Sequence, residues 1–389
     1  MNNNLKSQFL LRDDITFLNF GSFGACVKPV FEQYQAFQLE LEQEPVQFIT
    51  VKGVEYLKKS RKALANYLSC DDNDLVFVTN PSYAVNIIAK SFNLKAGDEI
   101  LATNLEYGAC DKTWNYYCNK VGAKYIRQEI PFPLTTTEEF VEAFFKGLTS
   151  KTKLVFISHI TSTTGLRLPA EAICKKAKEL GLMTFVDGAH APAQIDLNLS
   201  TLQADMYTGA CHKWMMTPKG SSFLYVKNEL QHLFDPLIVS WGYEPNLSTP
   251  ATFFDCHQMQ GTRDYSAFLT IPIAIDFMEK NDWKNVSKDC RDMVRENATR
   301  FATLLNTEAL TTNPNEFLVQ LCSTKIKTNE PLKLKQLLYD TYKIEVPVMQ
   351  LNDKVFLRYS IQIFNTQKDL DILYDALVDI KKQTNLIED

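Results

Sequence analysis

The sequence lacks the patterns that would place it in several common classes of protein. Its 389 residues contain no phosphate loop of the GxxxxGK(S/T) or GxGxxG type, which disfavours a P-loop or nicotinamide-binding enzyme. No apolar run reaches the length of a membrane span, and the polar first residues do not form a secretory signal. The net charge of -5 leaves no basic field for nucleic acid or anionic lipid. We therefore expect a cytoplasmic protein that binds neither nucleic acid nor membrane.

Paired cysteines are also missing. The nine cysteines are an odd number, scattered from Cys26 to Cys322 without a CxxC pair, which favours reduced thiols over disulfides or a zinc site. We expect no metal. What the chain does have is 45% hydrophobic and 22% charged residues, enough for a large core and for two domains.

Strand-like and helix-like segments alternate through the middle of the chain. Such alternation predicts an α/β fold with a mostly parallel sheet covered by helices on both faces. The predicted strands are 75–78, 99–102, 153–157 and 183–186, and the predicted helices are 84–92, 109–120 and 170–180, preceded by early helices at 31–41 and 56–67.

The pattern changes after Tyr265, where a smaller α+β domain is predicted. We expect residues 1–15 to form an N-terminal arm that packs on this domain or on a partner subunit, 16–265 a large domain, and 266–389 a small C-terminal domain. The predicted elements of the small domain are a long helical stretch at 268–305, helices at 332–341 and 367–382, and strands at 317–323, 344–349 and 354–359.

Two motifs carry the chemistry. Asp187-Gly188-Ala189-His190 ends one predicted strand, and His212-Lys213-Trp214 follows the next. A lysine amine can hold pyridoxal phosphate as a Schiff base, and a buried carboxylate keeps the nitrogen of the cofactor ring protonated, so that the ring accepts electrons. Taken singly, Asp187 as a helix cap and Lys213 as a solvated side chain are the simpler interpretations.

The chain resembles the fold-type-I pyridoxal-phosphate enzymes of the class V aminotransferase family, and within it the isopenicillin N epimerase-like branch. The resemblance implies a large domain with a seven-stranded type of sheet, a smaller C-terminal α+β domain, and pyridoxal 5'-phosphate as cofactor. It is carried in order by the segments 17–24, 79–86, 158–165, 187–191, 212–214 and 261–264, and by Arg358 with 364–366.

The resemblance implies roles for the residues around the cofactor ring. Lys213 matches the Schiff-base lysine, which also moves the proton at Cα, and Asp187 matches the partner of the ring nitrogen. His190 matches a contact to the ring oxygen, and Tyr107 matches the aromatic residue that stacks on the ring. As single residues, His190 and Tyr107 are equally well explained as core side chains.

The phosphate and the substrate have their own expected residues. Ala210 departs from the family pattern, because many relatives have a serine or asparagine there. Thr262 resembles a hydroxyl donated from a neighbouring subunit, which implies a homodimer with shared active sites. Further cofactor contacts are expected from Asn80, Ser82, Tyr83, His212 and Ser162, and substrate contacts from Arg358, Asn19 and Ser22.

The reaction type is less constrained. An aminotransferase or epimerase acting on a small amino-acid substrate is the leading expectation, a carbon–sulfur lyase is the alternative, and a non-catalytic regulatory protein that binds the cofactor is a third. The segment 339–357 has no cysteine, which disfavours desulfuration by a loop thiol. The candidates for a second acid or base are Tyr107, Tyr83, Tyr243 and His159.

Overall fold

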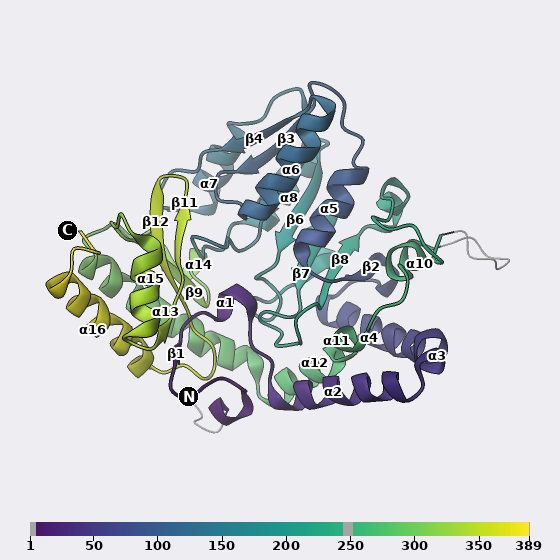
Figure 1. Ribbon diagram of the computed structural model, residues 1–389. Coiled ribbons are helices and arrows are strands. Elements are labelled where there is room, and N and C mark those ends of the chain that lie inside the picture. The colour runs from purple at the N-terminus through teal and green to yellow at the C-terminus, as the bar shows by residue number, and fades with distance from the viewer. Residues whose placement is uncertain (1–4, 244–251, 389) are drawn as a thin grey trace.

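The large domain is built around a seven-stranded sheet (Figure 1). The computed structural model describes residues 5–243 and 252–388, so the first four residues of the predicted arm lie outside the described part. The strands of the sheet are β2 (Leu75–Val78), β3 (Glu99–Thr103), β4 (Lys124–Gln128), β5 (Thr152–Ser158), β6 (Met183–Gly188), β7 (Met206–Ala210) and β8 (Ser222–Val226). Their order is β2-β8-β7-β6-β5-β3-β4, and β8 is antiparallel to both of its neighbours. The predicted mostly parallel α/β sheet is therefore confirmed.

Helices pack on both faces of this sheet because successive strand residues point to opposite sides. Val76 and Val78 join one apolar cluster with residues of α5 and α6, whereas Leu75 and Phe77 join another with residues of α4 and α8. The helices of the large domain are α1 (Phe20–Phe23), α2 (Lys28–Gln43), α3 (Pro45–Gln47), α4 (Gly53–Leu68), α5 (Pro81–Ser91), α6 (Gly108–Val121), α7 (Thr137–Phe145), α8 (Ala170–Glu179), α9 (Leu199–Leu202) and α10 (Phe253–Gln258).

The small domain is a three-stranded antiparallel sheet covered by helices. Its strands follow the order β11-β12-β9, and a separate short pair, β1 with β10, ties the start of the chain to this domain. The elements are α13 (Trp283–Leu304), α14 (Pro314–Phe317), β9 (Leu321–Lys325), α15 (Pro331–Asp340), β10 (Ile344–Glu345), β11 (Val348–Leu351), β12 (Lys354–Ser360) and α16 (Gln367–Gln383), with β1 at Thr16–Phe17.

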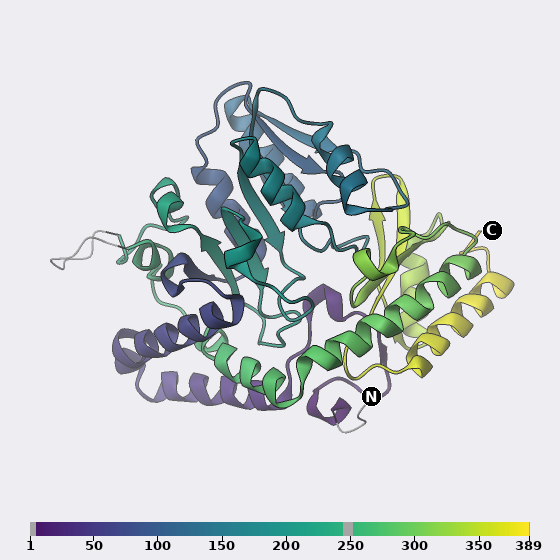
Figure 2. The same ribbon diagram turned by 180° about the vertical axis from the view of Figure 1, so that it is seen from behind.

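The stretch predicted as helical over 268–305 is helical in the structure, but it is not one continuous helix. The segment is divided into α11 (Ser266–Leu269), α12 (Ile271–Lys280) and α13, because proline lies in the first turn of α12 and Asp282 takes a left-handed φ of 49°. α11 and α12 pack against α2 and α4 of the large domain, whereas α13 packs against β9 and α16 (Figure 2). The domain boundary at 265 stays a prediction.

Two of the predicted strands of the small domain also differ from the structure. Residues 314–317 are helical, so that β9 begins only at Leu321, and the predicted strand 344–349 is divided into β10 and β11 at Pro347. A proline has no backbone N–H to give to a ladder, which explains the second break.

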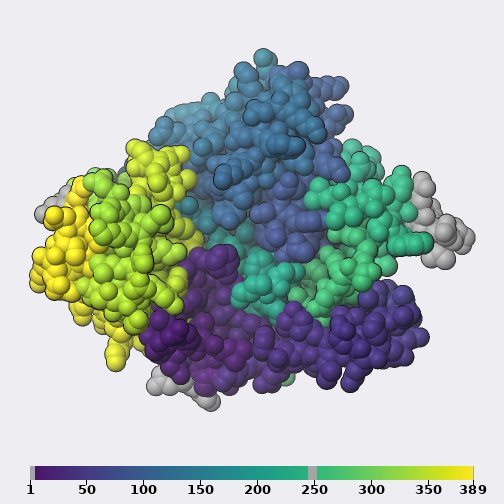
Figure 3. All heavy atoms as spheres, viewed as in Figure 1, coloured from purple at the N-terminus to yellow at the C-terminus, as the bar shows by residue number. Residues whose placement is uncertain are grey.

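The N-terminal segment lies between the two domains (Figure 3). Phe9 is buried, and its ring lies 4.8 Å from that of Phe364 in the loop between β12 and α16. Part of the predicted arm thus packs on the small domain of its own chain. No helix in residues 5–243 and 252–388 is long and apolar enough to cross a lipid bilayer.

Gly24 ends α1 and touches the turn between β7 and β8. Its φ of 64° and ψ of 178° are open essentially to glycine alone. A Cβ at this position would come within 2.7 Å of the Lys213 Cα atom. The chain at Gly24 therefore supports the backbone from which Lys213 projects.

Replacement of Gly24 by alanine should destabilise the protein by about 3 kcal/mol or more, because backbone strain and overpacking add. Gly181→Ala is the matched control, since Gly181 has a φ of 70° but no atom within 4 Å of an added Cβ. We expect it to cost about 1–2 kcal/mol. Urea unfolding of both variants measures the difference, and equal costs would refute close support of Lys213 by Gly24.

Candidate active site

One cavity of about 430 Å³ opens at the carboxyl edge of the large sheet. Its walls come from the segments that follow β2, β3, β5, β6 and β7, where a doubly wound sheet places its ligands. Another hollow, of about 750 Å³, lies at the opposite edge, before β3, β5 and β6. The first cavity brings together nine predicted site residues: Lys213, Asp187, His190, Tyr107, Asn80, Ser82, His212, Ser162 and Ser22.

Lys213 enters the cavity from the turn between β7 and β8. Its Nζ atom lies 3.1 Å from His190 Nε2. Loss of hydration lowers the pKa of Lys213 to about 8, although the nearby Asp187 carboxylate opposes the shift. About a tenth of the amine is therefore unprotonated at pH 7, far more than for an ordinary lysine, and a nucleophilic amine has to be unprotonated.

Asp187 lies at the end of β6 and is 2% exposed. Its Oδ1 atom accepts a 3.0 Å hydrogen bond from the Ala189 amide, and the Cys110 thiol points at Oδ2 from 3.5 Å. Burial raises the pKa of Asp187, while the Ala189 amide and the Lys213 charge oppose that shift. A cationic ring nitrogen beside this carboxylate would supply the missing opposite charge.

Anion-binding groups gather at another side of the cavity. Asn80 caps α5 by accepting a 2.9 Å hydrogen bond from the Tyr83 amide, and Ser82 lies in the first turn. His212 Nδ1 donates to the Ser221 carbonyl at 2.9 Å, which leaves Nε2 free to meet an anion. Burial lowers the pKa of His212 to about 4, and a bound phosphate would raise it again. Helix dipole, hydroxyl and imidazole together suit a phosphate.

Ser222 lies beside this phosphate-binding region and was not predicted from the sequence. It pairs with Ala210 across β7 and β8, and its Oγ atom lies 3.3 Å from His212 Nδ1. The hydroxyl that Ala210 lacks is thus present on the opposite strand, where it supports His212.

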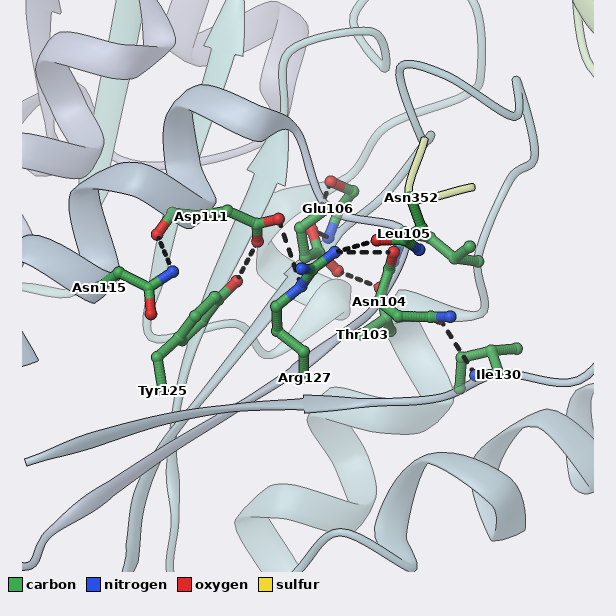
Figure 4. A network of polar contacts seen from close by, with 11 residues as sticks. Thr103, Asn104, Leu105, Glu106, Asp111, Asn115, Tyr125, Arg127, Ile130 and Asn352 are labelled. Carbon is green, nitrogen blue, oxygen red and sulfur yellow. Dashed lines mark hydrogen bonds and ion pairs between the residues drawn. The ribbon is translucent and has the colours of Figure 1, made fainter. Parts of the chain in front are cut away.

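Tyr107 reaches the cavity from the loop after β3, and two polar networks hold this loop. Glu106 is 1% exposed and accepts hydrogen bonds from Thr103 Oγ1 at 2.6 Å and from the Ser158 amide at 2.8 Å. Burial outweighs these donors and raises the pKa of Glu106 to about 8. On the outer side, Arg127 bonds the Asn104 carbonyl at 3.3 Å and pairs with Asp111 (Figure 4). These networks hold the backbone of the loop that carries Tyr107, whose own side chain is 47% exposed.

Arg358 comes from β12 of the small domain and is 1% exposed. Its guanidinium donates to the Ser162 carbonyl at 2.5 Å and to Ser22 Oγ at 3.1 Å. Ser22 in turn donates to Asn19 Oδ1, and Asn19 donates to Glu345. The three residues predicted to bind substrate thus form one chain of contacts at the edge of the cavity.

Some predicted residues lie away from the cavity. The Tyr83 hydroxyl donates to Gln260 at 3.0 Å, and Thr262 is exposed outside the cavity of its own chain. His159, directly after β5, is buried between Tyr207 and Glu171 and does not line the cavity. Tyr243 is 50% exposed and is not part of the wall. Cofactor contacts of Tyr83 and Thr262 therefore stay predictions.

The sequence analysis missed other residues of the cavity wall. Cys110, which the sequence analysis counted only among the nine reduced thiols, lines the cavity one helical turn after Tyr107, a spacing that could have revealed it. Ser158 ends β5 next to Asp187 in register. Thr79 and Gly220 also line the wall. Thr79 begins the segment 79–86 that carries the resemblance but was given no role, and Gly220 lies in none of the motifs.

Pyridoxal phosphate is suited to this set of residues. With the cofactor bound, Lys213 would supply the amine, buried Asp187 would pair with the ring nitrogen, and the start of α5 with His212 would hold the phosphate. The fold and the cavity are those of a fold-type-I enzyme that uses pyridoxal phosphate.

Comparisons with known proteins agree. The chain belongs to the class-V aminotransferase family, whose sequence profile matches residues 27–373. It is 31% identical to isopenicillin N epimerase of Amycolatopsis lactamdurans over 97% of this chain and 98% of that protein. It is 26% identical to L-cysteine desulfhydrase of Arabidopsis thaliana over 94% of this chain and 87% of the relative.

Solved structures share the fold. A cysteine desulfurase from Thermococcus onnurineus NA1 superposes with a TM-score of 0.85 at 20% identity, covering 98% of this chain and 99% of the other. The cystine C–S lyase C-DES, solved with its product cysteine persulfide, superposes with a TM-score of 0.82 at 20% identity, covering 94% and 98%. The predicted fold class and family are confirmed.

Lys213→Met should stabilise the cofactor-free protein at pH 7, because it removes an amine whose protonation the fold disfavours. The folded pKa of about 8 lies below the ordinary 10.5, so the unfolded chain binds more protons between these values and wild type gains stability as pH rises through them. With an allowance for water in the cavity, we expect the free energy of unfolding to rise by about 2 kcal/mol at pH 7. This gain should shrink towards pH 10.

Urea unfolding at pH 7 and pH 10 measures this gain, with Lys62→Met on the exposed side of α4 as control. The control should change stability by less than about 0.5 kcal/mol at both pH values. A pH-independent effect of Lys213→Met would contradict the lowered pKa.

Proposed function

We propose that this pyridoxal-phosphate enzyme inverts the configuration at Cα of an amino acid or amino-acid derivative. The observation that carries the proposal is the placement of two proton-carrying side chains in one cavity, Lys213 from the turn after β7 and Tyr107 from the loop after β3. Inversion requires removal of a proton on one face and its return on the other. Of the four candidates for the second group, Tyr107 is the one that lines the described cavity wall.

The relatives support the same reaction type. Two isopenicillin N epimerases, from Amycolatopsis lactamdurans and Streptomyces clavuligerus, align over 97% and 96% of this chain. An aminotransferase would use the same residues, since the cofactor and Lys213 serve both reactions. The second proton carrier is what favours epimerisation.

Each group of the chain has a physical task in this proposal. Bound pyridoxal phosphate supplies an electron sink that weakens the bonds at Cα. Asp187 holds the proton on the ring nitrogen, and His212 with Ser82 anchors the phosphate. Lys213 holds the cofactor and moves the proton at Cα, and Tyr107 packs over the ring and exchanges a proton on the other side.

The substrate carries an α-carboxylate, which Arg358 binds as a planar fork. That guanidinium now bonds the Ser162 carbonyl and Ser22 Oγ, so an entering carboxylate replaces at least one of these partners. Because Asn19 holds Ser22, it acts as a positioning residue for the same subsite.

A carbon–sulfur lyase is the second candidate, favoured by the cysteine desulfhydrases that align over most of the chain. Cys110 is the cysteine that lines the cavity in the described part of the chain. Burial raises its pKa well above the ordinary value, and Asp187 adds to the shift. A thiol held in that state is a poor nucleophile, so a lyase activity of this chain would not pass sulfur through it.

The chain is proposed to act as a cytoplasmic homodimer. Thr262 lies outside its own cavity and has an exposed side chain, as expected of a hydroxyl that serves a neighbouring copy. Trp241 and Val239, which are 79% and 65% exposed, offer apolar surface to such a contact.

The first experiment incubates the cofactor-loaded protein in D₂O with a pool of L-amino acids and no oxo acid. Incorporation of deuterium at Cα together with formation of the D-amino acid supports the epimerase. Conversion of the cofactor to its amine form would instead indicate a transaminase, and release of sulfide or pyruvate a lyase. Binding of the cofactor without any of these changes would leave two alternatives, a substrate that is missing from the pool and the non-catalytic regulatory protein.

Tyr107→Phe should reduce inversion by about 10²-fold or more, because the proton carrier on one side is lost while the ring is kept. Exchange of the Cα proton with D₂O should persist from one enantiomer, since Lys213 remains. Chiral chromatography and proton NMR measure the two processes. Tyr116→Phe, on the exposed side of α6, is the matched control. Equal loss of exchange and inversion in Tyr107→Phe would exclude the two-sided scheme.

A further inference from the structure

Trp214 follows Lys213 in the chain and contacts the same histidine from the other side. Its Nε1 atom lies 3.3 Å from His190 Nδ1, whereas Lys213 Nζ lies 3.1 Å from His190 Nε2. Trp214 is 0% exposed and His190 is 2% exposed. Each ring nitrogen of His190 therefore has one protein partner within hydrogen-bonding distance.

The chemistry of the indole fixes the direction of the first contact. An indole N–H donates and never accepts, so His190 Nδ1 must accept and carries no proton. Burial, together with the charges of Lys213, Arg358 and His212, lowers the pKa of His190, so the ring is neutral. A neutral imidazole without a proton on Nδ1 carries it on Nε2.

We infer that Trp214 is a positioning residue that holds His190 in the Nε2–H tautomer, so that the imidazole donates a hydrogen bond into the cofactor cavity beside Lys213. The inference rests on the proposed function for its acceptor, the anionic ring oxygen of the cofactor. The Nε2–H tautomer also decides between two roles for His190, hydrogen-bond donor to the cofactor and base at Cα. An Nε2 atom that carries the proton of a neutral ring is a donor and not a base. The second proton carrier is then Tyr107 and not His190.

The effect of Trp214 on the His190 tautomer can be tested separately from the charged groups around His190. The other charged or titratable groups that face the His190–Lys213 pair are Asp187 of β6, Cys110 of α6, Arg358 of β12 and His212. A Trp214→Phe variant changes none of them. The indole packs 5.2 Å from the Phe20 ring, so phenylalanine keeps an aromatic contact while removing the N–H.

The direct test is the tautomer itself, read from ring nitrogen shifts of the full chain labelled with ¹⁵N-histidine. The His190 signals are assigned by their absence in His190→Gln. The cofactor-free protein is measured at about pH 9.5, where the Lys213 amine, with a pKa of about 8, is neutral and can accept a hydrogen bond from Nε2–H. There we expect an unprotonated Nδ1 and a protonated Nε2 in wild type. The opposite tautomer, or a charged ring at that pH, would overturn the inference even if no variant folded.

Trp214→Phe should convert these shifts to those of a tautomer mixture. Trp114→Phe is the matched control, because Trp114 is also fully buried but its indole N–H has no partner among the described residues. It should leave the His190 shifts unchanged. A His190 ring that keeps the Nε2–H tautomer in Trp214→Phe would show that Trp214 does not set it.

The cofactor-loaded protein gives a second readout, the pH at which its visible absorbance band changes. Weakening a hydrogen bond to the ring oxygen should move that midpoint upward by about one unit in Trp214→Phe. In a His190→Gln background the same substitution should add nothing, because the path through His190 is gone. An additive shift would overturn the inference. Failure to bind pyridoxal phosphate would refute the proposed function and leave the tautomer result standing.

Discussion

The carboxylate of Asp187 and the amine of Lys213 lose hydration in one cavity, and this desolvation governs the rest of the site. It lowers the pKa of Lys213, raises that of Asp187 and lowers that of His212. Each shift leaves a group short of an opposite charge or a proton. A cofactor with a cationic ring nitrogen and an anionic phosphate would pair with Asp187 and His212 at once. The charges that these groups lack therefore fit one class of ligand.

Desolvation of this kind needs rigid walls, and the backbone around the strand ends leaves little room for adjustment. A Cβ on Gly188, directly after Asp187, would collide with the buried ring of Tyr207. The Tyr207 hydroxyl bonds His159, whose own amide donates to the Asp187 carbonyl at 2.8 Å. The interior of the sheet thus holds Asp187 from behind, while Gly24 holds the Lys213 turn from the N-terminal side.

The sequence predicted the parallel core, because hydrophobic periodicity marks the strands. The grouping of Lys213, Asp187, His190 and Tyr107 followed from the resemblance to the family, and it agrees with the rule that parallel strands end at one edge of a sheet. It did not predict β4, whose residues are largely half-exposed, or the short antiparallel β8. The break at Asp282 needs a left-handed residue that no local pattern signalled. Ser222 and Trp214 could not be assigned, since their importance lies in contacts across strands and turns and not in residue type.

The N-terminal segment contributes to the candidate active site although it precedes the family profile. The family profile begins at residue 27, but Ser22 contacts the Arg358 guanidinium and Gly24 touches the Lys213 backbone. A polypeptide trimmed to residues 27–373 would therefore keep every residue proposed to hold the cofactor ring. It would lose Ser22 and Gly24, which contact Arg358 and the Lys213 backbone. In this chain the functional unit begins ahead of the first residue of the family profile, and any shortened or fused form has to preserve the residues in between.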